Sequence, residues 1–133
     1  MASNFKKKLE VSGIRSILAD TNVLVYFLEG RPQLSLYTDT NFVISIITEI
    51  EFLGVRYIQG IPIQKRESLI KECIVLPLDE AIKDLAILVK RQTNLKTPDA
   101  IIAATAIKYR IPLLTADKDF KKVPDLSLLL LEI

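Results

Sequence analysis

Five short apolar segments restrict the possible folds of this chain more than any other feature of its sequence. They are rich in β-branched and aliphatic residues and cover residues 14–19, 42–47, 73–78, 112–115 and 128–133. Nearly continuous hydrophobicity is typical of strands that are buried on both faces, as in a parallel sheet. No hairpin turn signal joins these segments. We therefore predict an α/β domain of three layers, with a central parallel sheet flanked by helices.

Helical patterns occupy the intervals between the apolar segments. One predicted helix has its buried face defined by Ile50, Leu53, Tyr57, Ile58 and Ile61. A second pattern covers residues 81–89 and follows the expected helix start at Asp79-Glu80. A third helix is expected from Pro98 to about Arg110, because Thr97 can act as its N-cap and proline suits the first helical position. Its density of Ala and Ile predicts burial around most of its circumference.

The chain of 133 residues is long enough for one domain with its own core. Its apolar stretches fall well short of the roughly 18 residues that a membrane span needs. Lys6–Lys8 are not followed by the apolar run of a signal peptide. We therefore expect a cytoplasmic protein without membrane contact. Cys73 is the only cysteine, which excludes an intramolecular disulfide and a thiolate zinc site.

The absence of histidine restricts the chemistry that this chain can perform. It removes every mechanism that needs a histidine base, nucleophile partner or metal ligand. Hydrolysis would have to depend on carboxylates and on metal ions that they hold. The net charge of +2 is too small to indicate a nucleic-acid partner. There are two local basic clusters, Lys6–Lys8 and Lys118 with Lys121 and Lys122, for which solvated surface charge and phosphate contact are both open.

Four acidic residues follow the predicted strands at the position where parallel sheets bind ligands. Asp20 and Asp117 come after the first and fourth apolar segments, and Glu51 and Asp99 lie near the starts of the following helices. Carboxylates that lie close together repel one another and raise one another's pKa. A hard divalent cation such as Mg²⁺ or Mn²⁺ relieves this repulsion and prefers oxygen ligands.

These acids belong to four motifs that resemble those of PIN domains. The motifs are Asp-Thr-Asn at 20–22, Ser-x-x-Thr-x-x-Glu at 45–51, the Pro-Asp-Ala helix within 97–106, and Thr-x-Asp within 115–120. Their order and separations match the family from about Ile14 to the end of the chain. The size of the chain and the Pro98 helix are most similar to VapC-type toxins of bacterial and archaeal toxin–antitoxin pairs. Residues 14–133 are thus expected to be the PIN domain. Residues 1–13 form an N-terminal extension of unassigned role.

The resemblance implies a metal-binding and catalytic set of four carboxylates, namely Asp20, Glu51, Asp99 and Asp117. It implies that Asn22 and Thr115 are polar supports that orient them. The implied activity is metal-dependent hydrolysis of RNA, with tRNA or rRNA as possible substrates, and Mg²⁺ or Mn²⁺ as the cofactor. Hydrolysis by water would leave 5′-phosphate and 3′-hydroxyl ends. The implied partners are an antitoxin whose tail blocks the acidic pocket and a second copy of the chain in a homodimer.

All of these residues except Asp117 also have a structural alternative. Asp20 could cap the following helix, and Asp99 suits the positive end of a helix dipole. Glu51 could complete a capping box with Thr48, and only the motif spacing favours it over Glu49 as the metal ligand. The alternative for Asn22 is local backbone bonding and for Thr115 an ordinary place in a strand. Asp119 is expected to compensate the dipole of a first helical turn.

Three rival functions compete for the same residues. A PIN fold kept as a silent binding module is one, although all four acids are present. A receiver-like signalling domain would use Asp79 as its phosphoacceptor, but Lys118 follows the fourth segment instead of the fifth. A dehalogenase-type phosphatase would need a second aspartate at the position of Asn22.

Overall fold

The computed structural model describes residues 16–133. The predicted N-terminal extension, the Lys6–Lys8 cluster and the start of the first apolar segment lie outside the described residues. Within them, no helix is both long and apolar enough to span a membrane.

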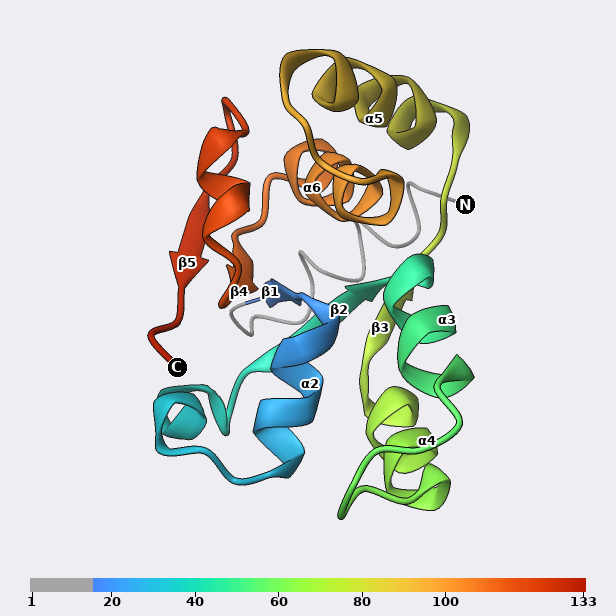
Figure 1. The fold of residues 1–133 in the computed structure, drawn as a ribbon, viewed down its shortest axis with the longest axis vertical. Helices are drawn as coiled ribbons and strands as arrows, with labels where there is room; N and C mark the ends of the chain where they lie inside the picture. Colours follow the sequence, from blue (N-terminus) through green and yellow to red (C-terminus); the bar gives the residue numbers. More distant parts are fainter. Residues whose placement is uncertain (1–15) are drawn as a thin grey trace.

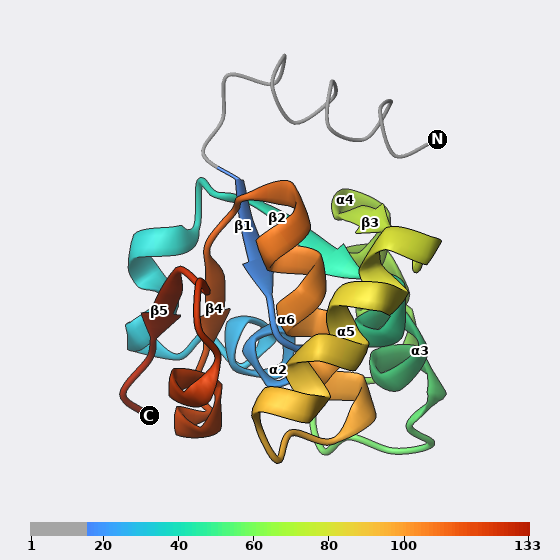
Figure 2. The same cartoon turned by 90° about the horizontal axis from the view of Figure 1, so that it is seen from above.

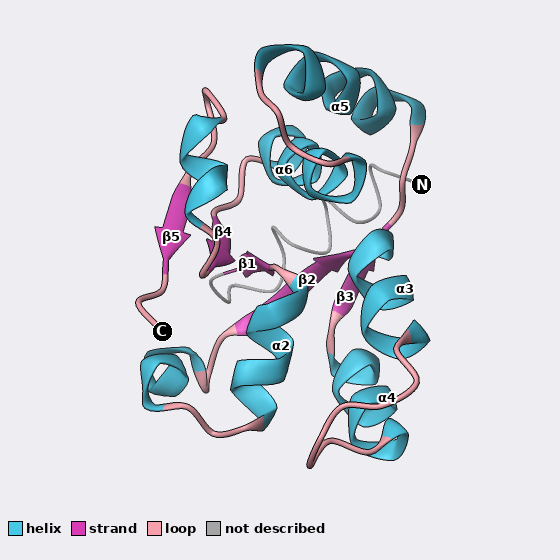
Figure 3. Ribbon diagram, viewed as in Figure 1, coloured by secondary structure: helices cyan, strands magenta, loops and turns pink. Residues whose placement is uncertain are grey.

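One parallel sheet of five strands lies at the centre of the domain (Figures 1 and 3). Its spatial order is β3-β2-β1-β4-β5, so β1 lies in the middle between β2 and β4. The strands are β1 (Ser16–Ala19), β2 (Asn41–Ser45), β3 (Ile74–Leu76), β4 (Leu113–Thr115) and β5 (Leu128–Leu130). Each overlaps one of the five predicted apolar segments. The prediction of a parallel α/β sheet is therefore confirmed.

Alternate residues of the strands enter two separate cores. Leu18 and Val43 pack with α5 (Glu80–Gln92) and α6 (Thr97–Tyr109) on one face of the sheet. Ile17 and Ile44 pack with α2 (Thr21–Leu28) and α4 (Ile63–Glu72) on the other. Successive side chains of a strand point to opposite faces, so a segment that is apolar throughout must be covered on both. Figure 1 shows this layering, with α6 next to the sheet and α5 outside α6.

Helix α6 confirms one sequence prediction and corrects another. Its residues Ala100 to Ala106 are all buried, as the density of Ala and Ile predicted. The predicted N-cap role of Thr97 is wrong, because the helix begins at Thr97 and its N-cap residue is Lys96. The Thr97 hydroxyl instead accepts a hydrogen bond from the Lys90 ammonium group at 2.9 Å.

Helix α3 (Ile46–Gly54) differs most from its prediction. It was expected to bury Ile50 and Tyr57, yet these side chains are 62% and 76% exposed. Tyr57 is exposed because the helix ends at Gly54 and the chain then forms a loop before α4. Ile50 is exposed because Thr48 and Phe52, four residues apart, share the buried face, and a residue two positions from each points away from it. Phe52 and Thr48 are the residues that α3 buries.

Helix α4 and η1 (Pro32–Tyr37), a short 3₁₀ segment, were not predicted. Helix α2 was considered only as the helix that Asp20 could cap, and Asp20 is its N-cap. A second 3₁₀ segment, η2 (Lys118–Lys122), follows β4. Asp79 caps α5 by accepting from the Ile82 amide at 2.9 Å, which agrees with the expected start of that helix.

Candidate active site

The carboxyl ends of the central strands bring acidic residues from four elements to one edge of the sheet. Asp20 follows β1 and is the N-cap of α2, while Asp117 follows β4 and is the N-cap of η2. Glu51 lies in α3, and Asp99 lies in the first turn of α6. Figure 2 shows the end of β1 where α2 begins. The sheet order explains the placement, because β1 is flanked by β2, which leads into α3, and by β4.

Asp20 is the most buried of these acids, with 7% of its surface exposed. Its Oδ1 accepts a hydrogen bond from the Thr21 amide at 2.8 Å, and its Oδ2 accepts one from the Thr115 hydroxyl at 2.7 Å. Burial raises the pKa of Asp20, and the two hydrogen bonds oppose this. The nearby charges of Glu51 and Asp117 raise the pKa again, so the net shift is upward.

Thr21 connects Asp20 to Glu51, a role that was not predicted from the sequence. The Thr21 hydroxyl donates to Glu51 Oε1 at 2.7 Å, and its oxygen lies 3.3 Å from the buried Thr48 hydroxyl. Both threonines lie within the recognised motifs, but nothing local in the sequence indicates that they meet. The contact joins the start of α2 to α3 and holds the Glu51 carboxylate beside the Asp20 segment.

The structure also separates Glu51 from its two structural alternatives. The proposed capping box of Thr48 and Glu51 is wrong, because Ser45 is the N-cap of α3 and accepts from the Ile47 amide at 3.1 Å. The charge of Glu49 affects Cys73 instead of the acids of the sheet edge. Burial raises the pKa of the Cys73 thiol to about 12, with added contributions from the charges of Glu72 and Glu49. Of the two glutamates in question, Glu51 is the one whose charge reaches Asp20 and Asp99.

Asp99 shows most directly that the four acids share one electrostatic environment. Burial raises the pKa of its half-buried carboxyl group to about 6, and the charges of Asp20, Asp117 and Glu51 contribute to the same rise. Lys96 is the neighbour that opposes the shift. The net shift is upward although Asp99 lies at a helix N-terminus, a position that by itself favours an ionised carboxylate.

Thr115 and Asn22, the two predicted supports, differ in their surroundings. The buried Thr115 hydroxyl donates to Asp20 and accepts from the Asp117 amide at 3.0 Å, so it contacts the segments of two acids. Asn22 is exposed in the first turn of α2. Among residues 16–133, no hydrogen bond joins its side chain to the four carboxylates. Asp117 also caps η2 by accepting from the Asp119 amide at 2.9 Å.

The donor set of this site fits a hard divalent cation. The side chains that meet here offer carboxylate and hydroxyl oxygens, which Mg²⁺ and Mn²⁺ prefer. Burial raises the pKa of Asp99 most, and the charges of Asp20, Asp117 and Glu51 add to the rise, so a cation bound here would favour the ionised carboxylate. Within residues 16–133, however, no three acidic side chains already converge on one ion position. Some of the carboxylate side chains would therefore have to rotate to reach the ion. This rotation would break some of their present hydrogen bonds.

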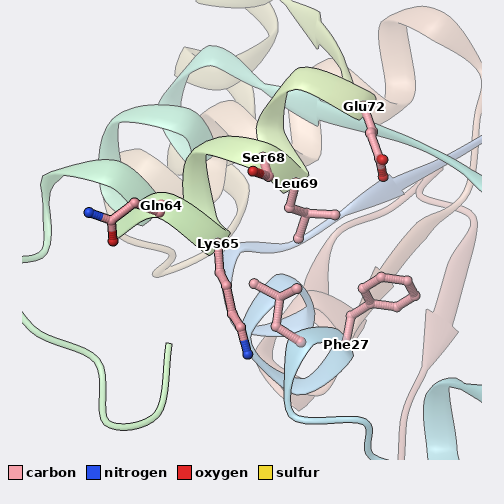
Figure 4. A pocket seen from close by; sticks show the side chains of 7 residues that line it. Phe27, Gln64, Lys65, Ser68, Leu69 and Glu72 are labelled. Atoms are coloured by element: carbon pink, nitrogen blue, oxygen red, sulfur yellow. The ribbon is translucent and has the colours of Figure 1, made fainter. Parts of the chain in front are cut away.

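A separate apolar groove lies between α2 and α4, with a volume of about 450 Å³ (Figure 4). Phe27 and Leu69 line it, and Lys65 and Glu72 lie at its sides. None of the four acids of the sheet edge is among its lining residues. The groove and the acid cluster are therefore distinct features, and the chemistry described above belongs to the acid cluster alone.

Comparisons with known proteins agree with this geometry. The sequence profile of the PIN domain matches residues 17–126. The chain is 31% identical over 126 residues to ribonuclease VapC4 of Mycobacterium tuberculosis, covering 87% of this chain and 97% of that protein. Its fold is similar to a chain of a toxin–antitoxin complex from Klebsiella pneumoniae, with a TM-score of 0.70, 28% identity, and coverage of 83% and 94%. VapBC2 from Rickettsia felis bound to a promoter DNA fragment shares the fold with a TM-score of 0.70 at 20% identity, with 88% of this chain and 99% of that chain covered.

Proposed function

Because this chain belongs to the PIN-domain family, we propose that it is a VapC-type ribonuclease, the toxin of a toxin–antitoxin pair, and that its acid cluster cuts RNA. The observation that carries the catalytic assignment is the hydrogen bonding at the sheet edge: Thr21 donates to both Asp20 and Glu51, and Thr115 contacts both Asp20 and the Asp117 amide. The chain has no histidine that could act as a base instead. The likeness to ribonuclease VapC4 supports RNA as the substrate, and tRNA or rRNA remains the predicted class.

The proposed chemistry assigns each side chain a task. A bound Mg²⁺ or Mn²⁺ ion would supply positive charge that neutralises the carboxylates and activates the scissile phosphate toward water. Asp20, Glu51, Asp99 and Asp117 would hold the ion. Thr115 orients Asp20, and Thr21 orients Glu51, through the hydrogen bonds of 2.7 Å that they donate. Hydrolysis without the 2′-hydroxyl as nucleophile would leave a 5′-phosphate and a 3′-hydroxyl end.

Two protein partners are part of the proposal. The solved toxin–antitoxin complex that resembles this chain supports an antitoxin. A homodimer is supported by exposed apolar side chains on or beside α3 and α5, namely Ile50, Leu78, Ile87 and Leu88, which are 44% to 62% exposed. A place in the cytoplasm, where such RNAs occur, stays a prediction.

RNA cleavage by the purified protein tests the proposal. We expect cutting in Mg²⁺ or Mn²⁺, none in EDTA, and products that a 5′-phosphate-dependent exonuclease degrades. Activity in EDTA, or 2′,3′-cyclic phosphate ends, would refute a metal-dependent hydrolysis. Tight RNA binding without cleavage under any metal would instead favour the silent binding module.

Substitutions of Glu51 and Glu49, which lie two positions apart in α3, test which glutamate belongs to the active site. Glu51→Gln should lower cleavage by about a hundredfold or more, because it removes one of the charges that hold the cation. Glu49→Gln, which changes the same group two positions earlier, should keep its activity. Induced expression without a partner should slow bacterial growth, and Asp20→Asn should relieve this at equal protein level. A dead Glu49→Gln beside an active Glu51→Gln would show that the assignment is reversed.

A further inference from the structure

The segment at the end of α3 packs against a buried arginine side chain, Arg66, that has no acidic partner among residues 16–133. Arg66 is only 2% exposed, although it lies in the middle of a polar helix. Its Nη1 donates to the carbonyl oxygens of Phe52 at 3.0 Å and Val55 at 2.7 Å, at the end of α3. Among the ion pairs of residues 16–133, none includes Arg66. A buried charge is costly unless an opposite charge or a full set of hydrogen bonds compensates it.

The hydrogen bonds of Arg66 compensate it only in part. The end of α3 is the negative end of a helix dipole, which explains why Nη1 lies against its carbonyl groups. Its Nε, however, is buried and has no hydrogen-bond partner. The Arg66 guanidinium therefore has neither a counter-charge nor a full set of hydrogen bonds, which leaves a positive charge that an anion beside it would offset.

A cavity of about 370 Å³ lies where such an anion could bind. Arg66 and Arg56 both line it, together with Gln64 and the turn at Gly60, whose φ of +76° is a conformation suited to glycine. Helix α4 begins at this cavity with Pro62 as its N-cap residue, and no side chain caps its first turn. The amide groups at a helix start point outward and attract anions. Arg66, Arg56 and this helix start thus offer three sources of positive charge or partial charge to one cavity.

The position of the cavity favours a phosphate of RNA as the anion. Figure 2 shows the chain between α3 and α4 on the same side of the molecule toward which β1 points, where the acid cluster lies. Arg66 binds the carbonyl of Phe52, the residue next to Glu51. Tyr57 is 76% exposed on the same loop and offers an aromatic face on which a base can stack. A polynucleotide that crosses the acid cluster and continues along α3 toward its C-terminal end would meet this loop (Figure 1).

We propose that Arg56, Arg66 and the N-terminus of α4 form a phosphate-binding pocket that holds a phosphodiester of the RNA substrate outside the catalytic acid cluster. The identity of the ligand as RNA rests on the proposed function, whereas the capacity to bind phosphate does not. The pocket positions the strand by its backbone and is indifferent to the base sequence, because a phosphate carries no sequence information.

Two measurements test the pocket without relying on cleavage. Inorganic phosphate should raise the melting temperature of the metal-free protein more than chloride at equal ionic strength, and Arg66→Lys, which keeps the charge but lacks Nε, should lose this difference. A short single-stranded RNA, measured by fluorescence anisotropy in EDTA, should bind Arg56→Ala about fivefold more weakly, and the slope of log K against log salt should fall by about one. Lys71→Ala removes an exposed charge from the last turn of α4 and should change neither phosphate binding nor the salt slope.

The outcomes separate this inference from the proposed function. If the protein cleaves RNA but Arg56→Ala and Lys71→Ala bind RNA equally, the pocket is refuted and the function stands. If phosphate stabilises the protein through Arg66 but RNA is neither bound nor cut, the pocket stands as a phosphate site and the RNA assignment fails. If Arg56→Ala weakens the binding of an acidic antitoxin segment and leaves RNA binding unchanged, the pocket binds protein carboxylates and our inference is wrong.

Discussion

The starts of α5 and α6 each place an aspartate at a helix N-terminus, and the two carboxyl groups have opposite environments. Partial burial raises the pKa of Asp79, but the hydrogen bonds and charge of Lys108 and the Ile82 amide outweigh it, so the net shift is downward. Asp99 has its pKa raised to about 6 by burial and by three neighbouring acids. The Lys108 ammonium group of α6 forms an ion pair with Asp79 at the start of α5, so Asp79 links the two helices.

The difference between these aspartates shows that a helix start alone does not give an aspartate its role. Both residues satisfy the same local rule, because both lie where a helix dipole favours negative charge. What differs is the element that faces each one. Asp79 faces a lysine from the last turn of α6, whereas Asp99 faces the acids at the carboxyl edge of the sheet. A carboxylate that lies beside other acids and has no basic partner is the one available to bind a metal cation.

The largest expected contrast between the two residues is in activity. Asp99→Asn should lower RNA cleavage in Mn²⁺ by about two or more orders of magnitude, on the scale of losing a charged group at a reacting phosphate. Asp79→Asn should stay within about twofold, since it touches no residue of the cluster. A cooperative thermal transition well above the assay temperature would show that each variant is folded. A loss of activity in Asp79→Asn without unfolding would remove the distinction between the two sites.

The second contrast concerns stability, and here Asp79, not Asp99, is the residue whose loss should have the larger effect. Asp79→Ala should lower the free energy of unfolding by about 1–2 kcal/mol, because it removes an N-cap and an ion pair that is only partly exposed to solvent. Asp99→Ala, measured in EDTA, should be at least as stable as the parent, because it relieves repulsion among the remaining acids. Urea unfolding of both variants and of Lys108→Met checks this. A destabilised Asp99→Ala would mean that Asp99 acts mainly as a structural residue.

The smallest expected contrast is the pH dependence of stability without metal. The folded-state pKa of Asp99 is raised from 3.8 to about 6, so the folded protein binds this proton more tightly than the unfolded chain does. Its contribution to stability is therefore lost as the pH rises from about 4 to about 6. For Asp79 the folded pKa is lowered, so its contribution is present above the ordinary aspartate value of 3.8 and is lost as the pH falls below it.

Unfolding in EDTA between about pH 4 and pH 7 measures this difference. The parent protein should lose stability relative to Asp99→Asn as the pH rises, and Mg²⁺ should remove most of the loss. Asp79→Asn should run parallel to the parent over the same range. If the parent and Asp99→Asn show the same pH profile in EDTA, the acids do not share the environment described above.

Much of the framework could be predicted from the sequence because it depends on local patterns. Segments that are apolar on both sides of a strand must be buried on both faces, which predicts the parallel sheet and its flanking layers. The carboxyl ends of such strands collect ligands, so the places of Asp20 and Asp117 directly after apolar segments assign both to one edge of the sheet. The burial of α6 followed from its composition. The absence of histidine restricted the chemistry to carboxylates.

Other features depended on contacts between residues that are distant in the chain. The hydrogen bond from Thr21 to Glu51, the opposite partners of Asp79 and Asp99, and the loop that ends α3 at Gly54 decided which side chains face one another. Helical spacing placed Ile50 in the core, but α3 buries Phe52 and leaves Ile50 at the surface. The periodicity of a sequence pattern reflects the helix or strand in which it occurs. It does not indicate which residue of another element lies opposite. Only tertiary structure brings that neighbour close, and the charge of the neighbour decides whether a carboxylate is paired or left for a metal ion.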